Sequence, residues 1–187
     1  MGRVIQFEER AVATLRAKLG AAESARADLL AFARGHSGAV ATIHHAVIAA
    51  LQADSFDELV AIVTCDWPTL LGLDAVALAL VVNGQGFRVD QHGVEHLEPT
   101  LIERALGAID EVALRNVGRG HPLFGQTAVT IRAEALVGLQ ADAPYPHGLL
   151  LLGQSGDHPM PSDEGALLLQ FLGAALGAML RRWATPN

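Results

Sequence analysis

Residues 75–82 constrain the fold more than any other part of the chain. They read Ala-Val-Ala-Leu-Ala-Leu-Val-Val, a continuous apolar run that indicates a buried strand. The next residues, Asn-Gly-Gln-Gly, are typical of a tight hairpin, because asparagine and glycine adopt positive φ at little cost. Residues 87–90 are then expected to return as the partner strand. An antiparallel sheet therefore begins here.

Helical patterns flank the hairpin on both sides. Ser55 and Glu58 have the spacing of a capping box, ahead of a helix that should end at Gly72. Pro99 begins a short helix, and a final helix should start at residue 162 or 163. This order predicts an α+β domain with an antiparallel sheet and helices packed on one side. Further strands are expected within residues 111–117, 127–139 and 149–152.

The N-terminal region has apolar residues three and four apart from Ile5 to Ala50, a heptad-like spacing. We expect a long N-terminal helix, with a kink or break at Gly35 to Gly38. This helix either lies on its own domain or pairs with a second copy, and pairing is favoured because an arm has little core to cover. The predicted domains are an arm at residues 1–53 and a body at residues 54–187. The dimer-interface residues expected in the arm are Val12, Leu15, Leu19 and Leu29.

The charge distribution agrees with two regions and narrows the partners. The chain of 187 residues has 13 Lys and Arg against 20 Asp and Glu, a formal net charge of −7. Nucleic-acid binders need a basic face, so no nucleic-acid partner is expected. Six basic and four acidic residues give residues 1–35 a charge of +2, which leaves −9 for the body. The hydrophobic fraction of 51% excludes a disordered chain.

Cysteine usage and the N-terminus indicate a cytoplasmic protein. The single Cys65 leaves no disulfide within the chain, which fits a reducing compartment. Charged residues interrupt residues 5–19, so no apolar segment of a secretory signal is present.

The final helix contains an apolar run, residues 165–180, interrupted only by Gln170. The run is shorter than the roughly 20 residues that span a bilayer, so no membrane association is expected. Gly173 and Gly177 lie one helical turn apart, a spacing that permits close approach of a neighbouring element. We expect these two glycines at a dimer interface.

The stretches that carry a family resemblance are residues 5–30, residues 56–82, Leu123-Phe124-Gly125 followed by residues 128–139, and residues 148–153. Their order resembles a GAF domain, and more closely the bacterial domain-of-unknown-function family 484, whose members resemble a GAF-type domain behind an N-terminal helical arm. The resemblance covers most of the chain and rests on the order and spacing of short motifs. It implies the fold and homodimerisation, and it implies no specific activity.

The resemblance also implies a ligand pocket between the sheet and its cover, within residues 87–124. Several cationic side chains gather in this segment, and guanidinium groups recognise carboxylates and phosphates. A pocket for a small anionic molecule is therefore one interpretation, and solvated loop charge is the other. The signature of cyclic-nucleotide-binding GAF domains is not recognisable. The candidate ligand-binding residues are Arg88, His92, His96, Arg115, Arg119, His121 and Phe124.

One segment matches a catalytic motif. His92, Glu95 and His96 have the H-x-x-E-H spacing of inverted zinc peptidases, in which a helix directs both histidines toward one metal. Gly93 and the nearby Pro99 oppose a helix here, so we expect neither a metal nor another cofactor.

The function expected from the sequence is that of a non-enzymatic, GAF-like regulatory or sensory module. It should homodimerise through helices, bind a small molecule and transmit a signal to a protein partner. A structural adaptor without a ligand and a metal-dependent hydrolase using the H-x-x-E-H motif are the alternatives.

Overall fold

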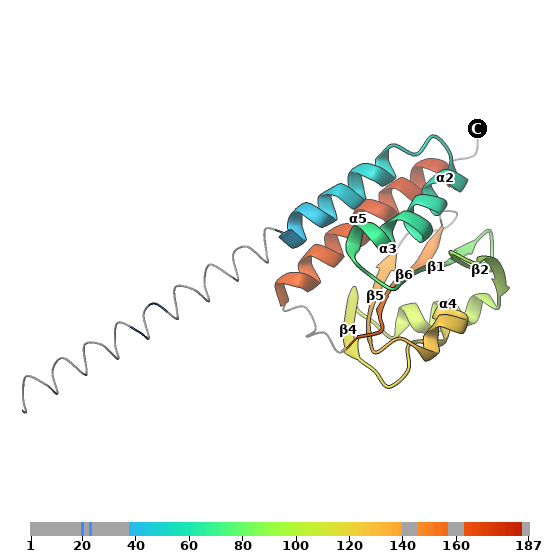
Figure 1. Cartoon of the computed structure of the whole chain (residues 1–187). Coiled ribbons are helices and arrows are strands. Elements are labelled where there is room, and N and C mark those ends of the chain that lie inside the picture. The colour runs from blue at the N-terminus through green and yellow to red at the C-terminus, as the bar shows by residue number, and fades with distance from the viewer. Residues whose placement is uncertain (1–19, 21–22, 24–37, 140–145, 157–162, 185–187) are drawn as a thin grey trace, which may run out of the picture. The chain divides into compact units, whose positions relative to one another are not determined.

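The computed structural model describes residues 20, 23, 38–139, 146–156 and 163–184 (Figure 1). The chain divides into two compact units, Met1–Ala41 and Thr42–Asn187. In the first unit the described residues are helical. Residues 35–37 and the arm residues Val12, Leu15, Leu19 and Leu29, for which a break and an interface were predicted, lie outside the described part.

The second unit begins with helical residues 42–51, which the sequence assigned to the arm. Ile43, Ala46 and Ala50 are buried in the core of this unit. The division after Ala41 is therefore twelve residues earlier than the predicted boundary at residue 53.

The second unit contains helices and strands in an α+β order. After residues 42–51 come α2 (Phe56–Ala61), the π-helical η1 (Ile62–Asp66), α3 (Trp67–Leu71), β1 (Ala75–Val82), β2 (Gln85–Asp90), β3 (Gly93–Leu97), α4 (Pro99–Gly107), β4 (Val112–Asn116), the 3-10 helix η2 (Pro122–Val129), β5 (Ala133–Leu139), β6 (His147–Gln154) and α5 (Asp163–Ala184).

The six strands form one antiparallel sheet in the order β3-β2-β1-β6-β5-β4. The predicted hairpin joins β1 to β2, with Val82 opposite Gln85. Its two turn residues have positive φ, 51° at Asn83 and 76° at Gly84, as a type I′ turn requires. The predicted α+β class with an antiparallel sheet is confirmed.

The helices before β1 form as their end signals predict. The Ser55 hydroxyl accepts from the backbone N–H of Glu58 at 3.1 Å, and the Glu58 carboxylate accepts from the N–H of Asp54 at 2.7 Å. Gly72 ends the run in a left-handed conformation, φ 66°. The π-helical turn precedes Pro68, which has no N–H to offer the helix.

One face of the sheet is covered by α2, α3, α5 and residues 42–51 (Figure 1). Trp67 is fully buried in this layer, and its Nε1 donates to the carbonyl oxygen of Ala46 at 3.0 Å. This bond satisfies the only polar atom of the indole ring and fixes residues 42–51 to the body. From α5, Leu172 and Leu176 complete the layer.

The opposite face is covered by α4 and η2, so helices pack on both sides of the sheet and not on one side as predicted. Ile102 from α4 and Phe124 from η2 pack with Ile131 and Leu149 on this side. The sheet thus separates two hydrophobic cores, because successive strand side chains point to opposite faces. No helix in the described residues is long and apolar enough to cross a membrane.

Candidate functional site

The α4 and η2 face carries the pocket that the sequence places near residues 87–124. At the centre of this face the side chains are closely packed and leave no space for a ligand. A methyl group on Gly153 would lie 2.7 Å from Ile131 Cδ1 and 3.1 Å from Phe124 Cε1, closer than side chains pack. Phe124, predicted to bind a ligand, is 1% exposed and belongs to this core.

A hollow remains at the edge of that core, between α4 and η2, with a volume of about 380 Å³. This volume lies within the usual range for small-molecule sites. Its lining is mainly apolar and includes one guanidinium and one imidazole. The lining residues are Leu97, Leu101, Arg104, Ala105, Ala108, His121, Pro122 and Leu123.

His121 is held in this hollow by two hydrogen bonds of its side chain and backbone N–H, and it caps the first turn of η2. Its Nδ1 accepts from the N–H of Leu123 at 3.2 Å, and its own backbone N–H donates to Glu134 Oε2 at 2.6 Å. Burial lowers the pKa of His121 below its ordinary value; Arg115 acts in the same direction and Glu134 opposes both. A neutral ring whose Nδ1 accepts carries its proton on Nε2, which is therefore a hydrogen-bond donor.

An ion pair between Arg115 and Glu134 holds His121 in position, because Glu134 accepts from the His121 backbone N–H. They are opposite one another on β4 and β5, and Arg115 Nε donates to Glu134 Oε1 at 2.6 Å. The Glu134 side chain is 1% exposed, whereas that of Arg115 is 47% exposed. Arg115, a predicted ligand residue, thus has a carboxylate partner inside the protein.

Arg88 is also paired within the chain. Its Nη2 lies 2.7 Å from Glu95 Oε2 and its Nε lies 3.4 Å from Asp90 Oδ2. The guanidinium occupies the space that a side chain on Gly125 would fill, and Gly125 has φ 61°. Arg88 therefore joins β2 to η2 and does not line the hollow.

The H-x-x-E-H segment is a turn and a strand, and the helix that the metal motif needs is not formed. His92 is in the turn, where its backbone N–H donates to Asp90 Oδ1 at 2.8 Å. Glu95 and His96 are successive residues of β3 that pair with Arg88 and Phe87, so they point to opposite faces. The His96 ring lies 4.7 Å from that of Phe87. No three His, Cys, Asp or Glu side chains in the described residues are grouped to hold a metal ion.

The seven predicted ligand residues thus do not line one cavity, and His121 alone of them lines the hollow. Arg119 is exposed in the loop before η2. Arg104 lines the hollow and was not among the predicted residues. The signal for it was helical spacing, because Leu101, Arg104, Ala105 and Ala108 share one face of α4.

Gly173, predicted at a dimer interface, faces this chain's own sheet. A side chain there would collide with Val137 Cγ1 of β5. The close approach that this glycine permits is therefore between α5 and β5. Gly177 is buried one turn later on α5.

Comparison with known proteins places these features in a family. The sequence model described as "Protein of unknown function, DUF484" matches residues 1–185. None of the curated proteins matches the chain.

Solved structures with the same fold include GAF domains. The GAF domain of a phosphoenolpyruvate-protein phosphotransferase from Coxiella burnetii has a TM-score of 0.56 at 12% identity, covering 79% of this chain and 95% of that one. A far-red absorbing protein with bound biliverdin IXα has a TM-score of 0.54 at 13% identity, covering 77% of this chain and 99% of that one.

A third similar structure is the chromophore-binding domain of a bacteriophytochrome from Stigmatella aurantiaca. It has a TM-score of 0.52 at 16% identity, over 74% of this chain. This chain spans 58% of that protein's length. At such identities the likeness shows the GAF fold alone.

Proposed function

Since the chain belongs to the DUF484 family and has a GAF-like fold, we propose that it is a non-enzymatic regulatory module of the cytoplasm. This module binds a small apolar molecule that carries an anionic group, and the binding site is the hollow between α4 and η2. The observation that carries this proposal is the combination, in one hollow, of an apolar lining with the Arg104 guanidinium and His121. A signal from this module passes to a protein partner.

The chemistry of the lining defines the ligand class. Leu97, Leu101 and Leu123 offer apolar contact, and Arg104 offers paired donors to a carboxylate, sulfonate or phosphate. His121 adds a single donor from Nε2 while its ring stays neutral. The biliverdin-bound structure of the same fold is a precedent for small-molecule binding, although its ligand carries over to this chain as a class only.

The test uses the fluorescent probe anilinonaphthalene sulfonate, which combines an aromatic body with one anionic group. We expect saturable binding to the full chain. Arg104→Gln should weaken it about fivefold or more, because it removes the partner of the sulfonate. Ala108→Trp should abolish it, since Ala108 is an exposed lining residue and an indole there fills the hollow.

Arg119→Gln is the matched control. It removes the same charge from an exposed arginine in the neighbouring loop that does not line the hollow, so probe binding should not change. Equal affinity in the Arg104→Gln, Ala108→Trp and unmodified proteins would contradict a ligand site here. It would favour the adaptor alternative.

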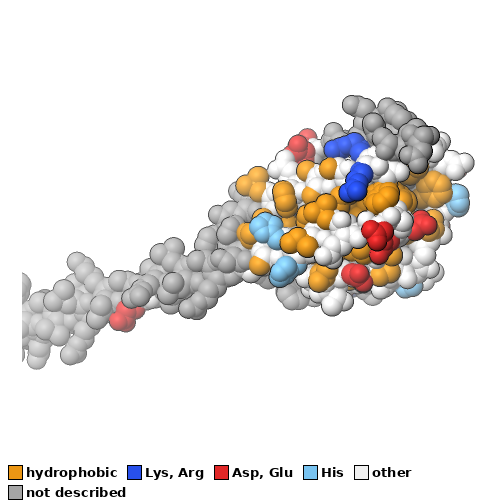
Figure 2. Space-filling model, turned by 90° about the horizontal axis from the view of Figure 1, so that it is seen from above, with side chains coloured by type: hydrophobic (Ala, Val, Ile, Leu, Met, Phe, Trp, Pro, Cys, Tyr) orange, Lys and Arg blue, Asp and Glu red, His pale blue; other side chains and the backbone are white. Residues whose placement is uncertain are grey.

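The module also homodimerises, in our proposal, through an exposed apolar face of its helices. Ile48 and Leu51 on residues 42–51 are 52% and 55% exposed, and Leu167 and Phe171 on α5 are 65% and 48% exposed. Figure 2 looks onto this side of the body, where hydrophobic side chains are numerous. A groove of about 280 Å³ between the two helices is lined by Val47, Leu51, Met179 and Trp183, among others.

A second copy is the occupant that the sequence favours. The heptad-like spacing predicted to pair two chains runs along the sequence to Ala50; within residues 42–51 its members Ile43 and Ala50 pack on the body, and Ile48 and Leu51 are the exposed apolar residues. Paired seams bring the two copies of this segment together, and its exposed leucine and isoleucine then have a partner. The interface thus uses the outer face of α5, while Gly173 serves its inner face.

Light scattering after size exclusion tests this interface. The unmodified chain should have the mass of a dimer, and Phe171→Glu should give a monomer. Val129→Glu is the control, because Val129 is 54% exposed on η2, on the opposite face. A dimer that survives Phe171→Glu, or a monomeric unmodified chain, would refute the proposed face.

A further inference from the structure

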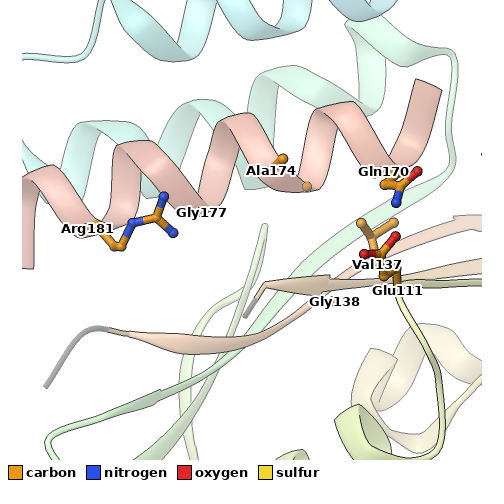
Figure 3. A pocket seen from close by; sticks show the side chains of 8 residues that line it. Glu111, Val137, Gly138, Gln170, Ala174, Gly177 and Arg181 are labelled. Atoms are coloured by element: carbon orange, nitrogen blue, oxygen red, sulfur yellow. The ribbon is translucent and has the colours of Figure 1, made fainter. Parts of the chain in front are cut away.

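A second hollow, of about 240 Å³, lies between α5 and the end of the sheet formed by β5 and β4 (Figure 3). It is on the opposite face of the sheet from the site between α4 and η2, since Val137 lines it and belongs to the core under α5. The lining residues are Glu111, Val137, Gly138, Gln170, Gly173, Ala174, Gly177 and Arg181.

Small residues of α5 create the space. Gly173 is required by packing, because any side chain would meet Val137. Gly177 is not, since an added methyl group would meet only Arg181 Nη1, at 3.6 Å, an ordinary contact distance. Glycine is unfavourable inside a helix compared with alanine. Packing within the chain therefore does not explain Gly177, but an occupant of the hollow would.

The hollow is positively charged at one end. The Arg181 side chain is half-buried and lies back over Gly177, with its guanidinium directed along the helix (Figure 3). In the described part of the chain no carboxylate forms an ion pair with Arg181. The guanidinium thus has its donors free for an anion.

The other end carries acceptors. Glu111, just before β4, and Gln170, on α5, approach each other there from opposite sides (Figure 3). The backbone carbonyl oxygen of Glu111 accepts from Gly138 N–H at 2.7 Å, which fixes this residue against β5. Its side-chain carboxylate has no ion-pair partner within the described residues.

The spacing between the two ends sets the length of the ligand. Gln170 and Gly177 are seven positions apart on α5, which is about 10 Å along the helix axis. Between them, Gly173 packs directly on Val137, and the exposed Ala174 borders the hollow on its open side. We propose that this hollow binds a slim zwitterion, an ω-amino acid, with its carboxylate at Arg181 and its ammonium group at Glu111 and Gln170.

Three probes separate the two charge contacts: δ-aminovalerate, which has both charges, valerate, which has only the anion, and n-pentylamine, which has only the cation. Isothermal titration of the full chain should show δ-aminovalerate binding at least about tenfold tighter than either single-charge probe. Arg181→Gln should reduce the zwitterion's affinity to that of n-pentylamine, and Glu111→Gln should reduce it to that of valerate.

Control variants keep the test specific. Arg182→Gln removes the next, exposed arginine, and Glu103→Gln removes an exposed carboxylate on α4; neither residue lines the hollow, so neither change should alter binding. Circular dichroism and a thermal melt confirm that each variant is folded. Three probes of equal affinity, no binding of δ-aminovalerate, or full binding by Arg181→Gln would each overturn the proposal. Because the two sites lie on opposite faces, δ-aminovalerate should not displace anilinonaphthalene sulfonate, and either site can fail alone.

Discussion

Arg115 Nε donates to Glu134 Oε1 at 2.6 Å, and through this bond an exposed strand edge holds a buried carboxylate. The second oxygen of that carboxylate accepts from the backbone N–H of His121. The pair therefore fixes where η2 begins and where His121 stands in the hollow. The Arg115–Glu134 pair thus affects the ligand site indirectly, because it fixes the position of His121.

Replacing Arg115 with methionine should destabilise the fold. The change leaves a buried carboxylate with one hydrogen bond fewer, which costs up to about 5 kcal/mol for a buried pair. Since Arg115 is about half exposed and water screens the pair, we expect a loss of about 2 kcal/mol. Urea unfolding of the variant and of the unmodified protein measures this difference in the free energy of unfolding. Arg119→Met, at an exposed loop position, should change the free energy of unfolding by no more than about 0.5 kcal/mol. Equal losses in the two variants would show that the pair adds no stability.

Stability should fall on mild acidification because of His121. Burial lowers the pKa of this imidazole in the folded state below its ordinary value near 6.5, so between these two values the unfolded chain binds more protons. The free energy of unfolding contributed by His121 is therefore complete above pH 6.5. It decreases as the pH falls from there to the folded-state pKa, and a protonated ring also loses its Nδ1 acceptor for Leu123.

His121→Asn isolates this contribution. Asparagine is a good helix cap that accepts from the same N–H and does not titrate. Urea unfolding at pH 7.5 and pH 5.5 should show a smaller loss of stability in the variant than in the unmodified protein. If both lose the same amount, other groups are responsible for the acid sensitivity.

The parts of the fold that sequence predicts are those with a buried face or a distinctive end signal. The hairpin follows from Asn83 and Gly84, and the start of α2 follows from Ser55 and Glu58. By contrast, the residues of β3 are all exposed or partly exposed. The sequence there has no alternation of apolar and polar residues from which this strand could be predicted. It forms because β2 offers it a pairing edge.

The residues of the candidate site were harder to predict than the fold, because their contacts depend on how the strands pair. The charges in residues 87–124 are visible in the sequence, but their partners depend on strand register. Arg88 meets Glu95 because they are opposite on β2 and β3, and Arg115 meets Glu134 in the same way on β4 and β5. A register shift of one residue would direct these side chains to other faces. Sequence alone therefore shows cations here and does not show which of them are already paired.

Gly125→Ala tests the structural use of Arg88. Gly125 has φ 61°, and the Arg88 guanidinium fills the space of a side chain, so alanine should cost about 2 kcal/mol or more. Thermal unfolding measures the loss. Gly118→Ala is the control, because a methyl group there meets nothing within 4 Å. A stable Gly125→Ala protein would mean that Arg88 can leave its carboxylates, and would return it to the list of ligand candidates.

The two glycines of α5 should respond to alanine in opposite directions, although the substitution and the helix are the same. Gly173→Ala forces a methyl group against the stiff Val137 side chain, and overpacking of this kind costs about 1–3 kcal/mol. Gly177→Ala meets only the end of the flexible Arg181 side chain, so the gain in helix propensity should stabilise the protein by up to about 1 kcal/mol. Calorimetric melting of the two variants gives both signs in one experiment.

In the Gly177→Ala protein the methyl group also takes space from the hollow, so δ-aminovalerate should bind more weakly while the fold becomes more stable. Two losses of similar size would instead mean that Gly177, like Gly173, is required by packing, and that the space beside it is no evidence for a ligand.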